Sequence, residues 1–381
     1  MYCQGKHLMT DPRQPRWPAS RDPMRARVIS SAAEVTAAWL TATLTAAGAL
    51  TAGSVAAFEV TTGSGNWSAN AILHLSYSQD ARGDRPPRLF LKMVNTHLNG
   101  EAFDASEVTY YTRDYVGVAG APLVRCYDAA YSAERQRYHL LLDDLTPTHV
   151  VASSRPPTLA YGVALAEGLA ALHATWWGAA GRAAAGAPLH DPAFIGRFVA
   201  IAEPGAGHIL AEFGDQLEPH WPGLIRELYA RHPAALMARA ANANGFTLIH
   251  GDVGAYNVLV PRQGDWPLYV IDRQPFDWSL TTWLGVYDLA YPIVIGWDTP
   301  ARRAWEMPVL RRYHEELRRR GVTDYGWEQL VADYRLMAAM GVYVVTEYCR
   351  AGVTPEWRRW GPPELRRVLT ACDDLQCAAL W

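Results

Sequence analysis

The chain has 381 residues, of which 50% are hydrophobic and 19% are charged. A chain of this length and apolar content can bury a substantial core, which excludes disorder throughout. Its 35 Lys and Arg residues stand against 38 Asp and Glu residues, giving a formal net charge of -3. Proteins that neutralise many nucleic-acid phosphates usually carry a basic excess, so we expect no nucleic-acid partner.

The cysteines favour a reducing compartment. They are odd in number and scattered, and none forms a C-x-x-C pair, which argues against a disulfide framework or a zinc site. Neither an early apolar run typical of a secretory signal nor an uninterrupted membrane-spanning segment is evident. We therefore expect a cytoplasmic protein, monomeric or homodimeric, with no membrane partner. The five cysteines are Cys3, Cys126, Cys349, Cys372 and Cys377.

The N-terminal part predicts a mobile tail followed by a small lobe. Residues 1–27 contain four prolines and no apolar period, which is typical of a tail. Ser31 and Glu34 fit a capping box that would start a helix. Period-2 patterns and a helical stretch then predict an antiparallel lobe with one helix over 28–142. The strands are expected at 55–61, 71–77, 88–94, 123–130 and 137–142, and the helix at 103–116.

After residue 142 the pattern changes. A short connector at 143–146 precedes an amphipathic helix at 158–177, and further helical segments continue to residue 243. A β-rich stretch at 247–272 is followed by helices to the C-terminus. The expected fold class is α+β, with a small antiparallel lobe and a larger, mainly helical lobe at 147–381.

One constellation indicates chemistry. Asp252 and Asn257 lie five residues apart on a loop that leads into an apolar strand, and a second strand delivers Asp272 at its end. A hairpin between these strands would bring Asn257 and Asp272 close together. Phosphoryl transfer needs a carboxylate beside the acceptor hydroxyl, with an amide oxygen and another carboxylate on magnesium.

This pattern, H-G-D-x-x-x-x-N from His250 to Asn257 followed by a strand ending in Ile271-Asp272, resembles the aminoglycoside phosphotransferase and choline-kinase-like superfamily. The closer likeness is to its ecdysteroid-kinase-like branch, and it spans roughly residues 30–350. The resemblance implies a bilobal protein-kinase-like fold, with a nucleotide-binding lobe at 28–142, a hinge at 143–146 and a catalytic and substrate-binding lobe at 147–381. It also implies transfer of the γ-phosphate of ATP or GTP to a small-molecule hydroxyl, as on an aminoglycoside, another antibiotic or an amino sugar.

The resemblance assigns roles in the helical lobe. Asp252 would orient or deprotonate the acceptor hydroxyl, and Asn257 and Asp272 would hold Mg²⁺ on the nucleotide phosphates. Asp288 would brace the catalytic loop, and His250 would support the same loop.

Lys92 is the only lysine beyond the N-terminal tail, and the sequence places it at the end of an apolar strand. By resemblance it would grip the α- and β-phosphates. Glu107 would be its helix partner, with Glu101 as the competing choice.

Two further segments have two interpretations each. Ser64, Gly65 and Asn66 lie between two strands, where they would cover the phosphates or form a plain hairpin turn. At the hinge, adenine would bind backbone groups from Asp143 to Leu145. The side chains of Asp143 and Asp144 would contact the nucleotide or cap the following turn.

The acceptor site is less well indicated. Asp277 and Trp278 follow the metal-binding strand and could line the cleft, although core packing explains the tryptophan equally well. No Lys or Arg lies between Arg197 and Arg226, where four acidic residues would favour a cationic acceptor or form a solvated helix face. They are Glu203, Glu212, Asp215 and Glu218.

His173, on the amphipathic helix, is interpreted as packing. Arg273 departs from the family, which commonly has an aromatic residue there. Its guanidinium would compete for the metal carboxylate, reach an anionic ligand or point into solvent.

Two alternatives stay open beside the small-molecule kinase. One is an inactive, nucleotide-binding regulator of the same fold, favoured only by Arg273. The other is a protein kinase, which fits less well because 16 residues from Asp272 to Asp288 are too few for a regulated activation segment.

Overall fold

The computed structural model describes residues 27–65, 67–98, 101–102, 104–186, 189–265, 267–273 and 275–381. The predicted tail therefore lies outside the described residues except for Arg27, and so does Asn66 of the predicted phosphate loop. The chain divides into two compact units. Unit 1 comprises Met1–Glu101, Glu107–Ala119 and Val124–Asp144, and unit 2 comprises Ala102–Ser106, Gly120–Leu123 and Leu145–Trp381.

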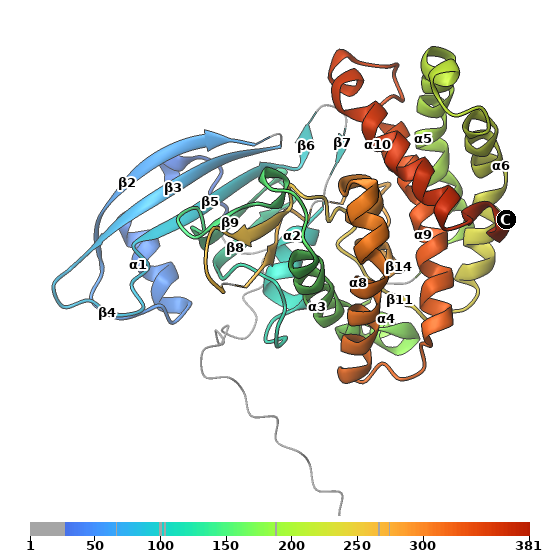
Figure 1. Cartoon of the computed structure of the whole chain (residues 1–381). Coiled ribbons are helices and arrows are strands. Elements are labelled where there is room, and N and C mark those ends of the chain that lie inside the picture. The colour runs from blue at the N-terminus through green and yellow to red at the C-terminus, as the bar shows by residue number, and fades with distance from the viewer. Residues whose placement is uncertain are drawn as a thin grey trace, which may run out of the picture. The chain divides into compact units, whose positions relative to one another are not determined.

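Unit 1 is built on a five-stranded antiparallel sheet with the order β2-β3-β5-β9-β8 (Figure 1). β5 lies at its centre, and five of its eight residues are buried, as expected for a strand covered on both faces. Short pairs β1–β4 and β6–β7 accompany it. The five strands are β2 (Val55–Ser64), β3 (Ser68–Tyr77), β5 (Arg88–Asn95), β8 (Cys126–Ser132) and β9 (Arg137–Asp143). The short ones are β1 (Leu50–Ala52), β4 (Arg82–Gly83), β6 (His97–Leu98) and β7 (Glu101–Ala102).

The first helix of unit 1, α1 (Ala37–Ala46), begins later than the capping-box pattern predicts. The side chain of Thr36 caps it by accepting a hydrogen bond from the Trp39 amide at 3.1 Å. Ser31 makes no cap bond and precedes only a 3-10 turn, η1 (Ala32–Glu34). Glu34 is engaged elsewhere, accepting a hydrogen bond from the Ser30 hydroxyl at 2.7 Å. The predicted capping box is therefore wrong.

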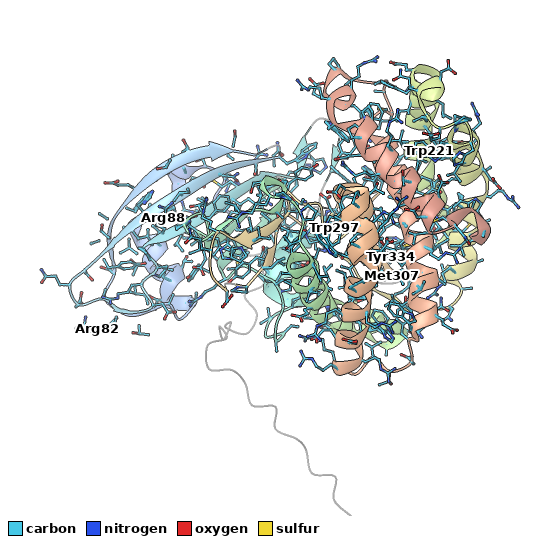
Figure 2. The ribbon with its side chains drawn as sticks, viewed as in Figure 1. Arg82, Arg88, Trp221, Trp297, Met307 and Tyr334 are labelled. Atoms are coloured by element: carbon cyan, nitrogen blue, oxygen red, sulfur yellow. The ribbon has the colours of Figure 1, made fainter. Side chains whose placement is uncertain are left out.

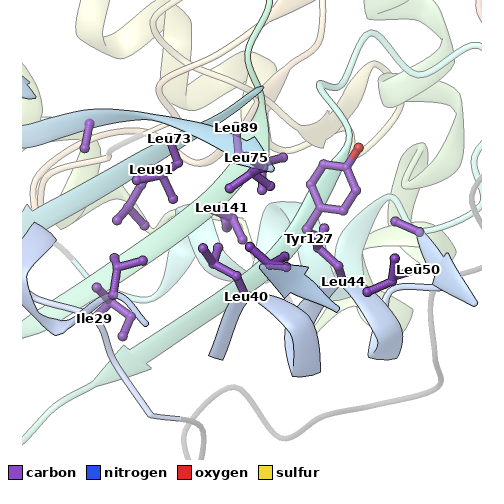
Figure 3. Packing of buried hydrophobic residues seen from close by; sticks show 14 of the residues in the cluster. Ile29, Leu40, Leu44, Leu50, Leu73, Leu75, Leu89, Leu91, Tyr127 and Leu141 are labelled. Carbon is purple, nitrogen blue, oxygen red and sulfur yellow. The ribbon is translucent and has the colours of Figure 1, made fainter. Parts of the chain in front are cut away.

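The core of unit 1 lies between α1 and the sheet (Figure 3). Removing such side chains from water stabilises a fold by about 1.5–3 kcal/mol each. The contributors include Leu40 and Leu44 of α1, Leu73 and Leu75 of β3, Leu89 and Leu91 of β5, Tyr127 of β8 and Leu141 of β9. The predicted helix at 103–116 is shorter, consisting of α2 (Ser106–Thr109) continued by a π-helical turn, η2 (Tyr110–Asp114).

Unit 2 is mainly helical (Figure 1). Its long helices start where the sequence offers capping side chains: Thr158, Asp191, Asp298 and Thr354 each accept a hydrogen bond from the amide three residues on. Its core helices pack α3 against α8, and α9 against α5 and α10. Tyr334 of α9 is buried there and donates a hydrogen bond to Glu306 of α8 at 3.1 Å (Figure 2).

The longer helices of unit 2 are α3 (Leu159–Thr175), α4 (Gly178–Ala185), α5 (Pro192–Phe213), α6 (Trp221–Ala240), α8 (Thr299–Arg319), α9 (Trp327–Glu347) and α10 (Pro355–Asp374). The short ones are η3 (Ala152–Ser154), η4 (Gly214–Gln216), α7 (Tyr287–Tyr291), the π-helical η5 (Pro292–Gly296) and η6 (Cys377–Leu380). Within the described ranges, no helix combines the length and the apolar character that crossing a membrane requires.

Two small antiparallel sheets frame the segment from 246 to 284. One has the order β10-β12-β13, and the other pairs β11 with β14. The predicted hairpin is present as β12 and β13, with Val258 opposite Val270. The strands are β10 (His149–Val151), β11 (Phe246–Leu248), β12 (Val258–Pro261), β13 (Tyr269–Val270) and β14 (Thr282–Leu284). An antiparallel sheet unit and a helical unit together confirm the predicted α+β class.

Candidate active site

The hairpin of unit 2 places Asn257 and Asp272 at the same end of two paired strands. Asn257 immediately precedes β12, Asp272 follows β13, and the Ile271 amide donates to the Asn257 carbonyl at 2.9 Å. Backbone pairing thereby brings these two residues to one end of the hairpin, as the sequence predicts.

Asp272 has a left-handed backbone, with φ of 69°. Only a few residue types adopt this region readily, and Asp is one of them because its short side chain tolerates it. A non-glycine residue held there costs about 1–3 kcal/mol, and such conformations concentrate at functional sites. The strained turn directly after β13 therefore marks Asp272 as a residue held in position by its surroundings.

Asp288 holds the loop that starts at His250. Its carboxylate is fully buried and accepts hydrogen bonds from the amides of His250 at 2.6 Å and Gly251 at 2.8 Å. Gly251 has φ of 86°, a conformation that favours glycine and turns the chain toward Asp252. Burial alone would raise the pKa of Asp288, but the hydrogen bonds from His173 and Gly251 help to hold that pKa below its ordinary value.

His173 is a second partner of Asp288 that sequence reasoning missed. Its Nε2 lies 3.1 Å from Asp288 Oδ2, and its Nδ1 lies 2.8 Å from the Tyr313 hydroxyl. Its own carbonyl accepts a hydrogen bond from the Thr247 hydroxyl at 2.8 Å. The interpretation as packing is therefore incomplete, because this buried histidine links α3 and α8 to the loop. The signal available in the sequence was a lone polar side chain on an apolar helix face.

His250 connects the loop to the hairpin. Its Nε2 lies 3.0 Å from the Ile271 carbonyl, and its Nδ1 accepts a hydrogen bond from the Asp252 amide at 3.3 Å. Burial lowers the pKa of His250 to about 4, so the ring is neutral at pH 7. A neutral ring with the proton on Nε2 satisfies both contacts at once.

Asp252 is an exposed residue at the end of this scaffold, and its carboxylate is engaged by neighbouring side chains. The Asn257 Nδ2 donates to both its carbonyl and its Oδ2, each at 2.9 Å, and the Tyr291 hydroxyl donates a further hydrogen bond to its side chain. Dehydration by the surrounding protein, together with the charges of Asp272 and Asp288, raises the pKa of Asp252 despite these bonds. A held carboxylate with raised proton affinity suits a group that accepts a proton.

Arg273 does not point into solvent. Its side chain is buried, and its Nε donates to the Ile249 carbonyl at 3.1 Å. Its positive charge contributes to the lowered pKa of His250. The arginine that departs from the family pattern is thus part of the scaffold beneath the loop.

In unit 1, Lys92 and Glu107 form a buried ion pair. The Lys92 ammonium lies 2.7 Å and 2.8 Å from the two Glu107 oxygens, and the Tyr138 hydroxyl donates to the same carboxylate. Lys92 does not end its strand, as the sequence suggested, because β5 continues to Asn95 and stays paired with β9. The side chain of Glu101, the alternative partner, lies outside what the structure describes.

The predicted phosphate loop is a tight turn between β2 and β3. Ser64 still pairs with Ala69, and the Gly65 amide donates to the Ser68 carbonyl at 2.8 Å. Asn66 lies outside the described residues, so its predicted contact has no structural counterpart here.

The hinge side chains are turned into unit 1. Asp143 accepts from the Tyr127 hydroxyl at 2.5 Å, and Asp144 accepts from Arg88 Nε at 2.6 Å. The Leu145 carbonyl accepts the amides of Thr148 and His149 at 3.0 and 2.8 Å. The turn after the hinge is therefore held by backbone bonds.

Asp277 and Trp278 lie on the segment after Asp272. Trp278 is half-buried and stacks on Phe276 at 5.1 Å between ring centroids, with Phe198 of α5 at 6.4 Å. Asp277 is exposed, and its carbonyl accepts from Arg197 at 3.0 Å. These contacts of Trp278 are packing contacts between aromatic rings. A role for Asp277 at the acceptor site stays a prediction.

The oxygen atoms of Asn257 and Asp272 fit a magnesium ion. Because the Asn257 amide nitrogen faces Asp252, its amide oxygen is the atom that can bind a cation. Within the described part of the chain, no three His, Cys, Asp or Glu side chains are grouped to hold a metal. A magnesium ion bound mainly by nucleotide phosphates and water does not need such a group.

No protein-family model matches the chain, and no curated protein matches it. Among solved structures, it resembles an ethanolamine kinase from Plasmodium vivax, with a TM-score of 0.53 and 10% identity over 83% of this chain and 81% of that one. At that identity the likeness shows the fold: the chain has the protein-kinase-like fold of small-molecule kinases, as predicted.

Two other structures are more distant in shape. A spectinomycin phosphotransferase in complex with ADP and spectinomycin aligns at a TM-score of 0.46 and 12% identity, over 90% of this chain and 99% of the other. A GDP and kanamycin complex of an aminoglycoside phosphotransferase aligns at 0.48 and 13%, over 84% and 94%. The ecdysteroid-kinase-like branch stays a prediction.

Proposed function

We propose that the protein is a phosphotransferase that moves the γ-phosphoryl group of ATP or GTP to a hydroxyl of a small-molecule acceptor. One observation carries the proposal: the Asp252 carboxylate is held by Asn257 at 2.9 Å, with Asn257 and Asp272 at the same end of one hairpin. A proton acceptor next to two oxygen ligands is the set that phosphoryl transfer uses. The protein-kinase-like fold supports the same reaction class.

Each side chain has a role that its contacts support. Asp252 accepts the proton of the acceptor hydroxyl, and Tyr291 and Asn257 orient its carboxylate. Magnesium, when bound by Asn257 and Asp272, neutralises charge on the phosphates. In unit 1, Lys92 offers an ammonium for the α- and β-phosphates and is oriented by Glu107.

The test is a transfer screen with ATP and GTP offered separately. Acceptors would include aminoglycosides, macrolides, nucleoside antibiotics, amino sugars, neutral sugars and choline-like alcohols. We expect transfer to at least one class, and a fall of at least 1,000-fold in kcat on Asp252→Asn, about what a lost catalytic base costs, with nucleotide binding retained. Asp265→Asn, an exposed residue of the β12–β13 turn, is the matched control. Full turnover by Asp252→Asn would refute the assignment.

A second variant tests the metal site. Asp272→Ala should weaken magnesium-dependent nucleotide binding, because it removes the only carboxylate assigned to the ion; unchanged magnesium dependence would contradict that role. Magnesium-nucleotide binding by the wild type without transfer to any acceptor would favour the inactive regulator. Labelling of a generic protein substrate would favour a protein kinase.

A further inference from the structure

Two unusually exposed tyrosines lie near Asp252. Tyr256 belongs to the same loop and is 63% exposed, and Tyr348, at the C-terminal end of α9, is 56% exposed. They are the most exposed large hydrophobic side chains among the described residues. Aromatic surface left open to water in this way is typical of a binding surface rather than of a core.

The backbone of Gly254 fixes where the Tyr256 ring lies. A Cβ atom added to Gly254 would stand 3.3 Å from Tyr256 Cδ2 and 3.4 Å from Tyr291 Cε1. Both rings therefore lie close to Gly254, a residue that has no side chain. Because the Tyr291 hydroxyl is bonded to Asp252, the Tyr256 ring lies beside the same glycine as a residue that contacts the candidate proton acceptor.

Tyr348 joins the same region through α10. Its ring packs edge-to-face on Trp360, with centroids 4.9 Å apart. Trp360 and Glu364 are four residues apart on α10 and so share a helix face. The Tyr348 phenol interacts electrostatically with Asp252, Tyr256 and Glu364.

Tyr256 experiences the same carboxylates. Glu364 and Asp252 both interact electrostatically with its phenol. Rings from three segments, together with a carboxyl from the third of them, thus lie in one region of unit 2. We refer to these side chains as the aromatic–carboxyl patch. Its members are Tyr256, Tyr348, Trp360 and Glu364.

The carboxyl group of the patch is partly neutralised. Burial raises the pKa of Glu364 to about 7, and Arg367 lies 3.6 Å from its carboxylate. Glu364 therefore carries only part of a charge at neutral pH and can donate as well as accept a hydrogen bond. The acidic stretch predicted to favour cations is partly neutralised by the same helix, since Arg358 pairs with Glu212.

We propose that the aromatic–carboxyl patch is the acceptor subsite and that it takes an uncharged alcohol carried on a ring. The face of the ring stacks on the two tyrosines, and a second polar group of the acceptor bonds to Glu364. This rests on the proposed function. In the reaction, the acceptor oxygen forms a bond to the γ-phosphorus while the bond from that phosphorus to the β–γ bridging oxygen breaks. The hydroxyl proton passes to Asp252, and a nucleoside diphosphate leaves.

The test measures acceptor binding directly, so that it does not depend on turnover. Calorimetric titrations of the nucleotide-bound protein would use matched rings, glucose against glucosamine and uridine against its 5′-amino analogue, with ethanolamine and choline as open-chain cations. We expect a neutral ring to bind more tightly than its amino partner. Tyr256→Ala and Tyr348→Ala should each weaken that binding about 10-fold, the size of one aromatic stacking contact.

Controls separate stacking from folding. Tyr256→Phe and Tyr348→Phe keep the ring and should bind as the wild type does, while Tyr131→Ala, in β8 of unit 1, should change nothing. Tighter binding of the open-chain cations, or alanine variants that bind neutral rings normally, would overturn the proposal, as would failure of every neutral ring to bind. If rings bind through the tyrosines but no phosphate is transferred, the subsite stands and the phosphotransferase assignment fails.

Discussion

Replacing Asp288 by asparagine tests how the candidate catalytic loop is held. The buried carboxylate accepts from the amides of His250 and Gly251 and lies 3.1 Å from His173 Nε2. Asparagine keeps the shape but turns one acceptor into a donor, so one buried N–H would face an NH₂ group. Hydrogen bonds to a charged group contribute about 1.5–3 kcal/mol, and an orphaned buried donor costs about 1–3 kcal/mol. We expect a loss of about 3–5 kcal/mol in the free energy of unfolding.

Urea unfolding followed by tryptophan fluorescence measures this loss in unit 2, because most of the 15 tryptophans lie after residue 144. The lowered pKa of Asp288 means that its stabilisation is fully present above its ordinary value of 3.8 and is lost as the pH falls through the folded-state value. The gap between wild type and Asp288→Asn should therefore narrow below about pH 4.

The same variant should lower kcat by at least about 100-fold, because the loop would no longer hold Asp252 in position. Asp298→Asn is the matched control: this residue caps α8 by accepting from the Ala301 amide at 2.8 Å, and asparagine caps about equally well. An unfolding free energy for Asp288→Asn within about 1 kcal/mol of wild type, with normal turnover, would refute the reasoning.

Three further predictions concern other groups of the site. Glu107→Gln should lower the free energy of unfolding by about 3 kcal/mol, because the buried Lys92 ammonium would lose its carboxylate. Adding Lys92→Met should restore most of that free energy but should not restore phosphate transfer. A double variant as unstable as the single one would contradict this. Tyr291→Phe should lower kcat about 10-fold at unchanged nucleotide KM, since it frees the Asp252 carboxylate; unchanged kcat would exclude positioning. Burial raises the pKa of Glu364 from 4.5 to about 7, so the contribution of Glu364 to stability falls as the pH rises between these values. In urea unfolding, Glu364→Gln should therefore be more stable than wild type by about 3 kcal/mol at pH 8 and about equally stable at pH 4.

The elements that the sequence predicts well are those set by local pattern. The five strands of unit 1 and the helix at 158–177 lie within a few residues of their expected bounds, since alternation and amphipathic spacing determine them. The hairpin follows from two apolar runs separated by Pro261, Gly264 and Pro267. The start of α1 was misplaced because Ser31 and Thr36 are both residue types preferred at an N-cap, and only the backbone geometry decides between them.

Contacts between distant segments were harder to predict. His173 and Asp288 are 115 residues apart, and a single histidine on an apolar helix face gives no partner by itself. The left-handed backbone of Asp272 has no signature in its residue type, since aspartate also occupies ordinary conformations. The family resemblance pointed to Glu107 as the partner of Lys92, with Glu101 as the competing choice, and the structure holds Lys92 and Glu107 within 2.8 Å.

The charge of the segment between Arg197 and Arg226 also depends on contacts that the local sequence does not show. The stretch from Arg197 to Arg226 contains no other Lys or Arg, so by sequence it presents a negative surface. In the structure, α10 supplies two arginines to this stretch. Arg358 forms an ion pair with Glu212, and Arg366 donates a hydrogen bond to the Gln216 carbonyl at 2.5 Å. A charge pattern read along one segment therefore overstates the local field when another helix supplies the counter-ions. The acceptor's charge is better inferred from the groups assembled around Asp252 than from the composition of any single segment.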